Sequence, residues 1–292
     1  MLRERRRNMP GSSKEKLPVV AIMYDFDRTL CTKDMQEYTF IPSLDESAET
    51  FWGKAQKLAR KENMDSILAY MYLMVRLSHD KHKPISREVF RKCGSSIKLF
   101  PGVMEWFDMI NRFGEQQGVK IEHYIISSGL KEIIEGNPIA DRFSRIYACE
   151  FHYDENGMAD WPKLSVNYTN KTQFLFRINK GLLDIGNDRQ VNRYVPEELR
   201  PVPFRNMIYI GDGMTDVPCM KLVKVNGGQS IAVYQKHEVD TVRTLLTDNR
   251  VNYIARADYR EGKEIDLIVR DIIIKMAAVS RLNRRSEKAR SI

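Results

Sequence analysis

The stretch "IMYDFDRTLCTKD", residues 22–34, joins the end of an apolar run to two closely spaced acids. The run itself, "VVAIMYDF" at residues 19–26, is rich in β-branched and aromatic residues, which is typical of a buried strand. It breaks off at Asp25, and Asp27 follows with one residue between them. Ligands of parallel α/β sheets bind beyond the carboxyl ends of the strands. The pattern therefore predicts two carboxylates at the ligand-binding edge of a sheet.

Further short apolar runs alternate with helix-like patterns along the rest of the chain. They occupy residues 122–128, 145–151, 206–212, 229–234 and 252–257. Such alternation predicts an α/β fold, a Rossmann-like and mostly parallel sheet with helices on both faces. We expect this core to comprise residues 19–32 and 100–280.

Residues 33–99 contain helical patterns and no convincing strand, so they predict a helical cap inserted after the first strand. Within it, "SLDE" at residues 43–46 is typical of a capping box that starts a helix. Asp65 and Ser86 are the expected N-caps of two further helices.

The helix expected at residues 65–79 is apolar on nearly all sides. One interpretation makes it the buried centre of the cap. The other turns Tyr70, Tyr72 or Met74 towards a substrate cleft or a second subunit. The sequence leaves both open.

The formal net charge of +8 lies entirely in the two ends of the chain. Residues 1–18 and 281–292 each carry +4, and the body between them is neutral. We interpret these as basic tails, which does not favour nucleic acid as a partner. The four cysteines have no paired spacing, no leader is evident, and no apolar run reaches the ~20 residues that span a bilayer. These features predict a cytoplasmic protein without a membrane partner.

Three more polar motifs follow apolar runs or begin helices. "YIISSG" ends a strand in Ser127 and Ser128, and "NYTNKTQ" places Lys171 at the start of a helix. "IYIGDGMTD" ends a strand in Asp212, with Asp216 four residues later. With Asp25 and Asp27 these form an ordered set of acid, hydroxyl, lysine and acid.

This ordered set resembles the haloacid dehalogenase (HAD) superfamily, and within it the phosphoserine-phosphatase-like group, over about residues 19–235. The resemblance implies that the insert is a type-1 cap and that the site performs phosphoryl transfer with Mg²⁺. It also implies metal ligands at Asp25, at Asp212 and at the backbone carbonyl of Asp27, with Asp216 either a direct ligand or a residue that contacts a ligand.

The residue types suit that chemistry. Asp25 is the expected nucleophile, which forms an aspartyl-phosphate, and Asp27 is the expected general acid and base. Lys171 supplies fixed positive charge, and Ser127 donates a hydrogen bond to a phosphoryl oxygen. Lys180 and Ser128 are the alternatives for these two roles. The expected substrate-binding residues are Phe26, Thr29, Asp34, Ser128 and Gly129.

The sequence thus predicts a Mg²⁺-dependent phosphatase that hydrolyses a small-molecule phosphomonoester. Two departures make phosphoserine only one candidate substrate. Asp34 stands where phosphoserine phosphatases usually carry Glu, and Arg28 replaces a small residue. Asp34 either meets a cationic group or caps the first cap helix. The alternative functions are a phosphotransferase or phosphomutase, and a non-catalytic or nucleic-acid-associated binding protein; the sequence does not indicate the oligomeric state.

Overall fold

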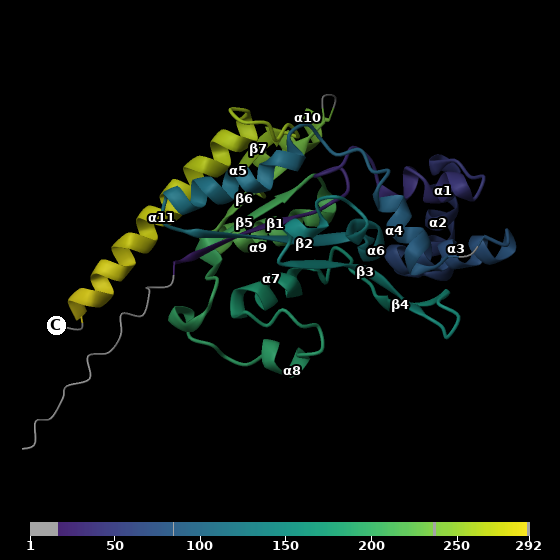
Figure 1. Cartoon of the computed structure of the whole chain (residues 1–292), viewed down its shortest axis with the longest axis horizontal. Coiled ribbons are helices and arrows are strands. Elements are labelled where there is room, and N and C mark those ends of the chain that lie inside the picture. Colours follow the sequence, from purple (N-terminus) through teal and green to yellow (C-terminus); the bar gives the residue numbers. More distant parts are fainter. Residues whose placement is uncertain (1–16, 84, 236–237, 291–292) are drawn as a thin grey trace, which may run out of the picture.

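The protein is built around one seven-stranded sheet of strand order β4-β3-β2-β1-β5-β6-β7 (Figure 1). The computed structural model describes residues 17–83, 85–235 and 238–290. Neighbouring strands are parallel except at the β3–β4 edge, where they form an antiparallel hairpin. The strands are β1 (Val19–Tyr24), β2 (Lys120–Leu130), β3 (Arg145–Tyr153), β4 (Ala159–Leu164), β5 (Met207–Gly211), β6 (Gln229–Tyr234) and β7 (Tyr253–Arg256). The predicted α/β fold is confirmed.

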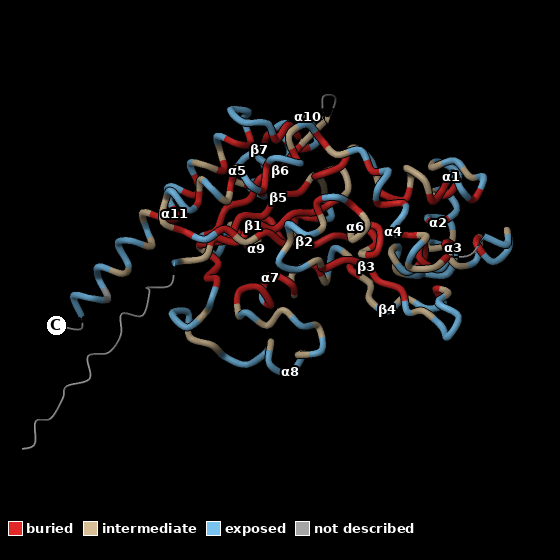
Figure 2. Tube along the Cα trace, viewed as in Figure 1, coloured by how far each residue is buried: buried red, intermediate tan, exposed pale blue. Residues whose placement is uncertain are grey.

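Helices cover both faces of this sheet. Helices α5 (Val103–Gln116) and α11 (Glu264–Arg290) lie on one face, and α7 (Lys171–Lys180) and α9 (Val217–Val225) lie on the other (Figure 1). Between these layers the central strands are buried along their length (Figure 2). The shorter helices of this part are α6 (Lys131–Glu135), α8 (Asp188–Val191) and α10 (Val239–Thr247).

A buried polar chain ties β1 and β2 to α5. The Trp106 indole N–H donates to the Tyr24 hydroxyl at 2.8 Å, and that hydroxyl lies 3.0 Å from Nδ1 of His123. Nε2 of His123 lies 3.0 Å from Oδ1 of Asn111. Because Oδ1 of Asn111 only accepts, the proton of a neutral His123 is on Nε2, and Nδ1 accepts from the Tyr24 hydroxyl. Burial lowers the pKa of His123 to about 3.

The helical insert lies at one end of the sheet, at the right of Figure 1. It contains α1 (Phe40–Ser43), α2 (Ala48–Glu62), α3 (Ser66–Asp80) and α4 (Arg87–Gly94). The two chain segments that connect it to the core run side by side. Cys31 and Leu99 form an antiparallel bridge, and the Phe100 N–H donates to the Leu30 carbonyl at 2.9 Å. This pairing holds the two ends of the insert together.

The capping box expected at Ser43 is wrong. Ser43 is the last residue of α1, and Asp45 then adopts a positive φ of 54°, which interrupts the helix. Helix α2 begins after Ser47, whose side chain accepts the Thr50 N–H at 3.1 Å. The N-caps expected at Asp65 and Ser86 are confirmed, because both side chains accept backbone N–H groups of the following turn.

The two charged ends of the chain differ in what the structure describes. Residues 1–16 and 291–292 lie outside the described residues. Residues 281–290 continue α11, so this part of the expected C-terminal tail is helical. Across the described part of the chain, no helix is both long and apolar enough to cross a membrane.

Candidate active site

The strand register brings the predicted residues to one edge of the sheet. Tyr24, the last residue of β1, pairs with Ile125 of β2 on one side and with Ile210 of β5 on the other. The next residues along each strand therefore lie together. Asp25, Ser127 and Asp212 are among them, and all three line one cavity.

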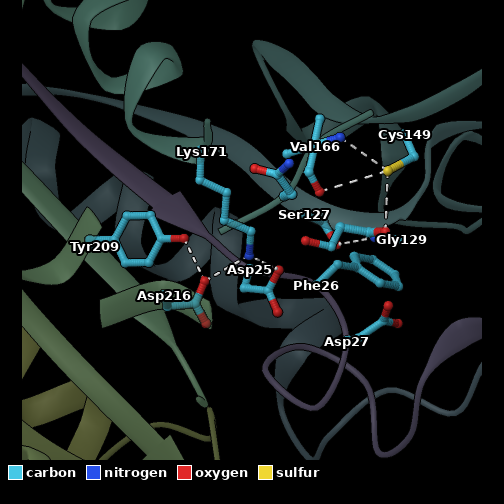
Figure 3. Close-up of polar contacts among 12 residues, drawn as sticks. Asp25, Phe26, Asp27, Ser127, Gly129, Cys149, Val166, Lys171, Tyr209 and Asp216 are labelled. Carbon is cyan, nitrogen blue, oxygen red and sulfur yellow. Dashed lines mark hydrogen bonds and ion pairs between the residues drawn. The ribbon is translucent and has the colours of Figure 1, made fainter. Parts of the chain in front are cut away.

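Lys171 holds two of the acids together (Figure 3). Its Nζ lies 3.0 Å from Oδ1 of Asp25 and 2.8 Å from Oδ1 of Asp216. The Tyr209 hydroxyl donates to the same Asp216 oxygen at 2.8 Å. Lys171, Asp25 and Asp216 are buried, and Lys171 is the first residue of α7, as expected. Lys180, the alternative, donates instead to backbone carbonyls of Val191 and Arg193.

Asp25, Asp212 and Asp216 form a cluster that fits a divalent cation. One carboxylate oxygen from each lies within 4.8 Å of the others. Oδ2 of Asp216 is buried and has no hydrogen-bond partner among the described residues. Carboxylate oxygens are the ligands that Mg²⁺ prefers. Of the four residues predicted to hold the metal, Asp27 does not bring its side chain into this cluster.

Electrostatics favour added positive charge here. Burial, together with the charge of Asp216, raises the pKa of Asp25 to about 7 although Lys171 opposes this. Burial and the charge of Asp25 also raise the pKa of Asp212. Burial alone lowers the pKa of Lys171, but Asp216 and Asp25 outweigh it and raise that pKa. One ammonium group thus faces three carboxyl groups, so a cation bound among them would relieve their repulsion.

Asp27 lies on the far side of Phe26, away from the Lys171 cluster (Figure 3). Its Oδ1 accepts the Met35 N–H at 2.7 Å, which orients the carboxyl group. Burial, and then the charges of Asp34 and Asp25, raise its pKa well above the ordinary value. A carboxyl group with a raised pKa retains its proton at higher pH and can donate it.

Gly129 leaves the room that this arrangement needs. A Cβ atom at Gly129 would lie 2.0 Å from Cε of Met35 and 2.8 Å from Oδ2 of Asp27. Any side chain there would displace the expected general acid. The role of Gly129 is therefore to leave space for the side chains of Met35 and Asp27.

Both candidate serines line the cavity. Ser127 is fully buried, and its Oγ accepts the Gly129 N–H at 3.1 Å, which leaves its proton free for donation. The Ser128 Oγ is also buried and has no hydrogen-bond partner among the described residues. The geometry brings both hydroxyls to the site.

The loop that follows Asp25 is held by hydrogen bonds to its own carbonyl groups. The Phe26 carbonyl accepts the Leu30 N–H at 2.9 Å, and the Tyr259 hydroxyl donates to the Thr29 carbonyl at 2.8 Å. The Thr29 side chain is buried. These contacts close the turn that follows β1.

Arg28 and Asp34 also line the cavity. Arg28 adopts a positive φ of 57°, its Nε lies 3.4 Å from Oδ2 of Asp212, and its guanidinium pairs with Glu238. Asp34 precedes the short helix Met35–Glu37, but its side chain makes no capping hydrogen bond. Burial and the neighbouring Glu37 raise the pKa of Asp34 to about 6. The capping alternative for Asp34 is therefore wrong.

The cavity has a volume of about 530 Å³ and lies between the sheet edge and the insert. Trp52 and Tyr70 of the insert line it, so α3 is at once buried and turned towards the cleft through Tyr70. Tyr72 is exposed and Met74 is buried in the insert. Trp52 and Tyr209 were not expected from the sequence. A tyrosine in a strand of aliphatic residues is a signal for Tyr209, since its buried hydroxyl needs a partner.

Comparison with known proteins gives the same fold. A family model described as haloacid dehalogenase-like hydrolase matches residues 22–221. An uncharacterized protein of Borreliella burgdorferi is 28% identical over 278 residues, which cover 86% of this chain and 95% of that protein.

Solved structures agree with this match. A HAD family hydrolase of Salmonella enterica serovar Typhi has a TM-score of 0.55 at 18% identity, covering 87% of this chain and 71% of that chain. A phosphoserine phosphatase in its apo form has a TM-score of 0.53 at 15% identity, covering 85% of this chain and 97% of that chain. The predicted family is confirmed: this chain belongs to the haloacid dehalogenase-like hydrolases.

Proposed function

We propose that this protein is a Mg²⁺-dependent phosphatase that hydrolyses a small-molecule phosphomonoester through an aspartyl-phosphate. The observation that carries the proposal is the position of Lys171 between Asp25 and Asp216, with Asp27 lining the same cavity. The fold shared with phosphoserine phosphatase supports the same reaction class.

In the first step a carboxylate oxygen of Asp25 attacks phosphorus and the bond to the leaving oxygen breaks. Asp27 gives its proton to that oxygen, so the product leaves as an alcohol. Lys171 keeps positive charge beside Asp25 and the phosphoryl oxygens, and Ser127 donates a hydrogen bond to one of them.

In the second step Asp27, now ionised, takes a proton from the attacking water. The water oxygen bonds to phosphorus, the bond to the Asp25 oxygen breaks, and inorganic phosphate forms. Asp25, Asp212 and Asp216 would hold Mg²⁺, which supplies positive charge that offsets the repulsion between carboxylate and phosphate. The negatively charged phosphoryl group could therefore bind next to the three carboxylates.

The test is phosphate release by the wild-type protein and by Asp25→Asn, each with Mg²⁺ and with EDTA. We expect Asp25→Asn to lose activity by about a thousandfold or more, because no nucleophile remains. EDTA should abolish wild-type activity. Asp141→Asn, an exposed acid, is the matched control and should keep full activity.

Turnover by Asp25→Asn at the wild-type rate would contradict the proposal, provided that both proteins unfold at the same temperature. Equal amounts of free phosphate and alcohol distinguish hydrolysis from transfer to an acceptor.

We propose the cytoplasm as the compartment of this protein. The four cysteines are free and buried, which suits a reducing environment.

A further inference from the structure

Strand β5 borders both oxygens of the Asp216 carboxyl group. The Tyr209 hydroxyl donates to Oδ1 at 2.8 Å (Figure 3). The other oxygen, Oδ2, lies against Gly211, where an added Cβ atom would be 2.4 Å from it. Tyr209 and Gly211 are two residues apart in the same strand, so their side-chain positions lie on the same face of the sheet. This face of β5 therefore restricts the rotation of the carboxyl group.

The two oxygens of Asp216 differ in their partners. Oδ1 accepts from the Tyr209 hydroxyl and from Nζ of Lys171, which also lies 2.8 Å away. Oδ2 is buried and accepts no hydrogen bond from the described residues. A buried carboxylate oxygen without a donor is costly, so it needs a partner that the chain itself does not supply. Because Asp216 belongs to the cluster with Asp25 and Asp212, the oxygen that remains for a cation is Oδ2.

Lys171 alone does not fix this arrangement. Its Nζ is shared between Asp216 and Asp25, and an ammonium group can turn its three protons towards either carboxylate. The Tyr209 ring, in contrast, is fully buried in the strand, and close packing gives its hydroxyl a fixed position. The hydroxyl has one proton, and Oδ1 of Asp216 accepts it. Tyr209 is therefore the donor that selects which oxygen of Asp216 faces Lys171.

We infer that Tyr209 is a positioning residue for the metal site: its hydroxyl keeps Oδ1 of Asp216 with Lys171 and leaves Oδ2 available to a divalent cation. The inference rests on the proposed function, in which Asp25, Asp212 and Asp216 hold Mg²⁺. Without the hydroxyl the carboxyl group can turn, and Lys171 and the cation then compete for the same oxygens. Removal of a group that orients a metal ligand typically weakens metal binding about 10- to 100-fold.

Tyr209→Phe removes the hydroxyl and keeps the buried ring. Binding of Mn²⁺, which suits the same oxygen ligands as Mg²⁺, is measured from the electron paramagnetic resonance signal of the free ion and requires no turnover. We expect Tyr209→Phe to bind Mn²⁺ about tenfold more weakly than the wild-type protein.

Tyr147→Phe is the matched control. Tyr147 is also fully buried in a strand, and its hydroxyl donates to the Leu183 carbonyl at 2.9 Å. It does not line the active-site cavity, so this variant loses a buried hydrogen bond of the same kind without touching the cluster. Its affinity for Mn²⁺ should equal that of the wild-type protein.

A double-mutant cycle separates positioning from a merely structural role. If Tyr209 acts through Asp216, Tyr209→Phe should have no effect on Mn²⁺ affinity in an Asp216→Asn background, where Asp25 and Asp212 remain as ligands. A structural role would weaken binding by the same factor in both backgrounds and would overturn the inference. If Asp216→Asn removes Mn²⁺ binding altogether, the comparison of Tyr209→Phe with Tyr147→Phe decides.

Equal Mn²⁺ affinity of the wild-type protein and Tyr209→Phe would overturn the inference, as would an equal loss in Tyr147→Phe or a lack of binding by the wild-type protein. Hydrolysis of p-nitrophenyl phosphate by the wild-type protein is measured separately. If that hydrolysis occurs and Mn²⁺ affinity does not depend on Tyr209, the inference fails and the proposed function stands. If the affinity depends on Tyr209 and no phosphomonoester is hydrolysed, the proposed function fails and the positioning role stands.

Discussion

Two side chains that line the cavity are oriented by backbone groups from other segments. The carboxyl group of Asp27 is held by the Met35 N–H, and the Tyr70 hydroxyl by the Ser128 carbonyl. A backbone partner cannot be lost by exchanging one side chain. The orientation of the expected acid therefore depends on the turn between Asp27 and Met35 keeping its shape.

His123 makes a residue-scale prediction about pH. Its pKa is about 3 in the folded protein and near 6.5 in the unfolded chain, so the unfolded chain binds more protons between these values. The contribution of His123 to stability is complete above pH 6.5 and is lost as the pH falls towards 3. In His123→Gln we expect the free energy of unfolding to fall less steeply in this range, by up to about 1.4 kcal/mol per pH unit.

The measurement is urea unfolding at a series of pH values for the wild-type protein and the variant. His123→Gln will be less stable at neutral pH because its packing changes, so the slopes are compared and not the absolute values. His79→Gln is the control, since its side chain is 88% exposed. Parallel curves for wild type and His123→Gln would refute the prediction.

At the scale of elements, glycines set how closely two helices approach. Helix α4 of the insert packs against α6 of the core, and Asn137 donates to the Gly94 carbonyl at 3.0 Å. A Cβ atom at Gly94 would lie 2.1 Å from the Ile133 carbonyl oxygen, and one at Gly136 would lie 1.9 Å from the Arg91 carbonyl oxygen. Helix α4 belongs to the insert in sequence, but it is seated directly on core backbone.

Gly94→Ala should therefore destabilise the protein by about 1–3 kcal/mol, because the new methyl group meets backbone that cannot move aside alone. Gly53→Ala is the matched control. Gly53 lies inside α2 with nothing within 4 Å of its added Cβ, so this change should stabilise by about 0.5–1 kcal/mol. The denaturant midpoints of the two variants test this prediction. Equal effects of the two changes would show that the α4–α6 contact can accommodate an added methyl group.

On the scale of the whole molecule, the end of α11 is exposed, whereas the rest of this helix packs against the core. The buried residues of α11 extend to Ala277, and residues beyond it are largely exposed (Figure 2). Residues 281–292 carry a net charge of +4, whereas residues 19–280 are neutral overall. The end of the helix thus adds charge and little core.

Removal of residues 283–292 should change the free energy of unfolding by less than about 1 kcal/mol, because exposed residues contribute little to the core. Phosphate release should stay at the wild-type level, since the residues of this range that the structure describes, 283–290, do not line the active-site cavity. Thermal unfolding and the phosphatase assay check both statements. A large loss of stability would mean that the end of α11 packs more firmly than its exposure indicates.

The sequence by itself determined the family and six of the seven strands that the structure describes, and it marked the candidate reacting residues. A strand of a parallel sheet is buried on both faces, so its apolar run and the polar residue that ends it are local features that can be read directly. Asp25, Lys171 and Asp216 follow from such local patterns. The start of α2 was predicted wrongly because two serines, Ser43 and Ser47, offer similar capping signals, and the backbone turn at Asp45 decides between them.

Only the tertiary structure decided which residues far apart in the chain share a cavity wall. Trp52 and Tyr70 come from different helices, and Ser128 from a strand of the core. Helical periodicity says which side of a helix is apolar, but not which partner covers it. For this reason the family follows from motifs, whereas the set of residues that share the cavity follows from the three-dimensional arrangement.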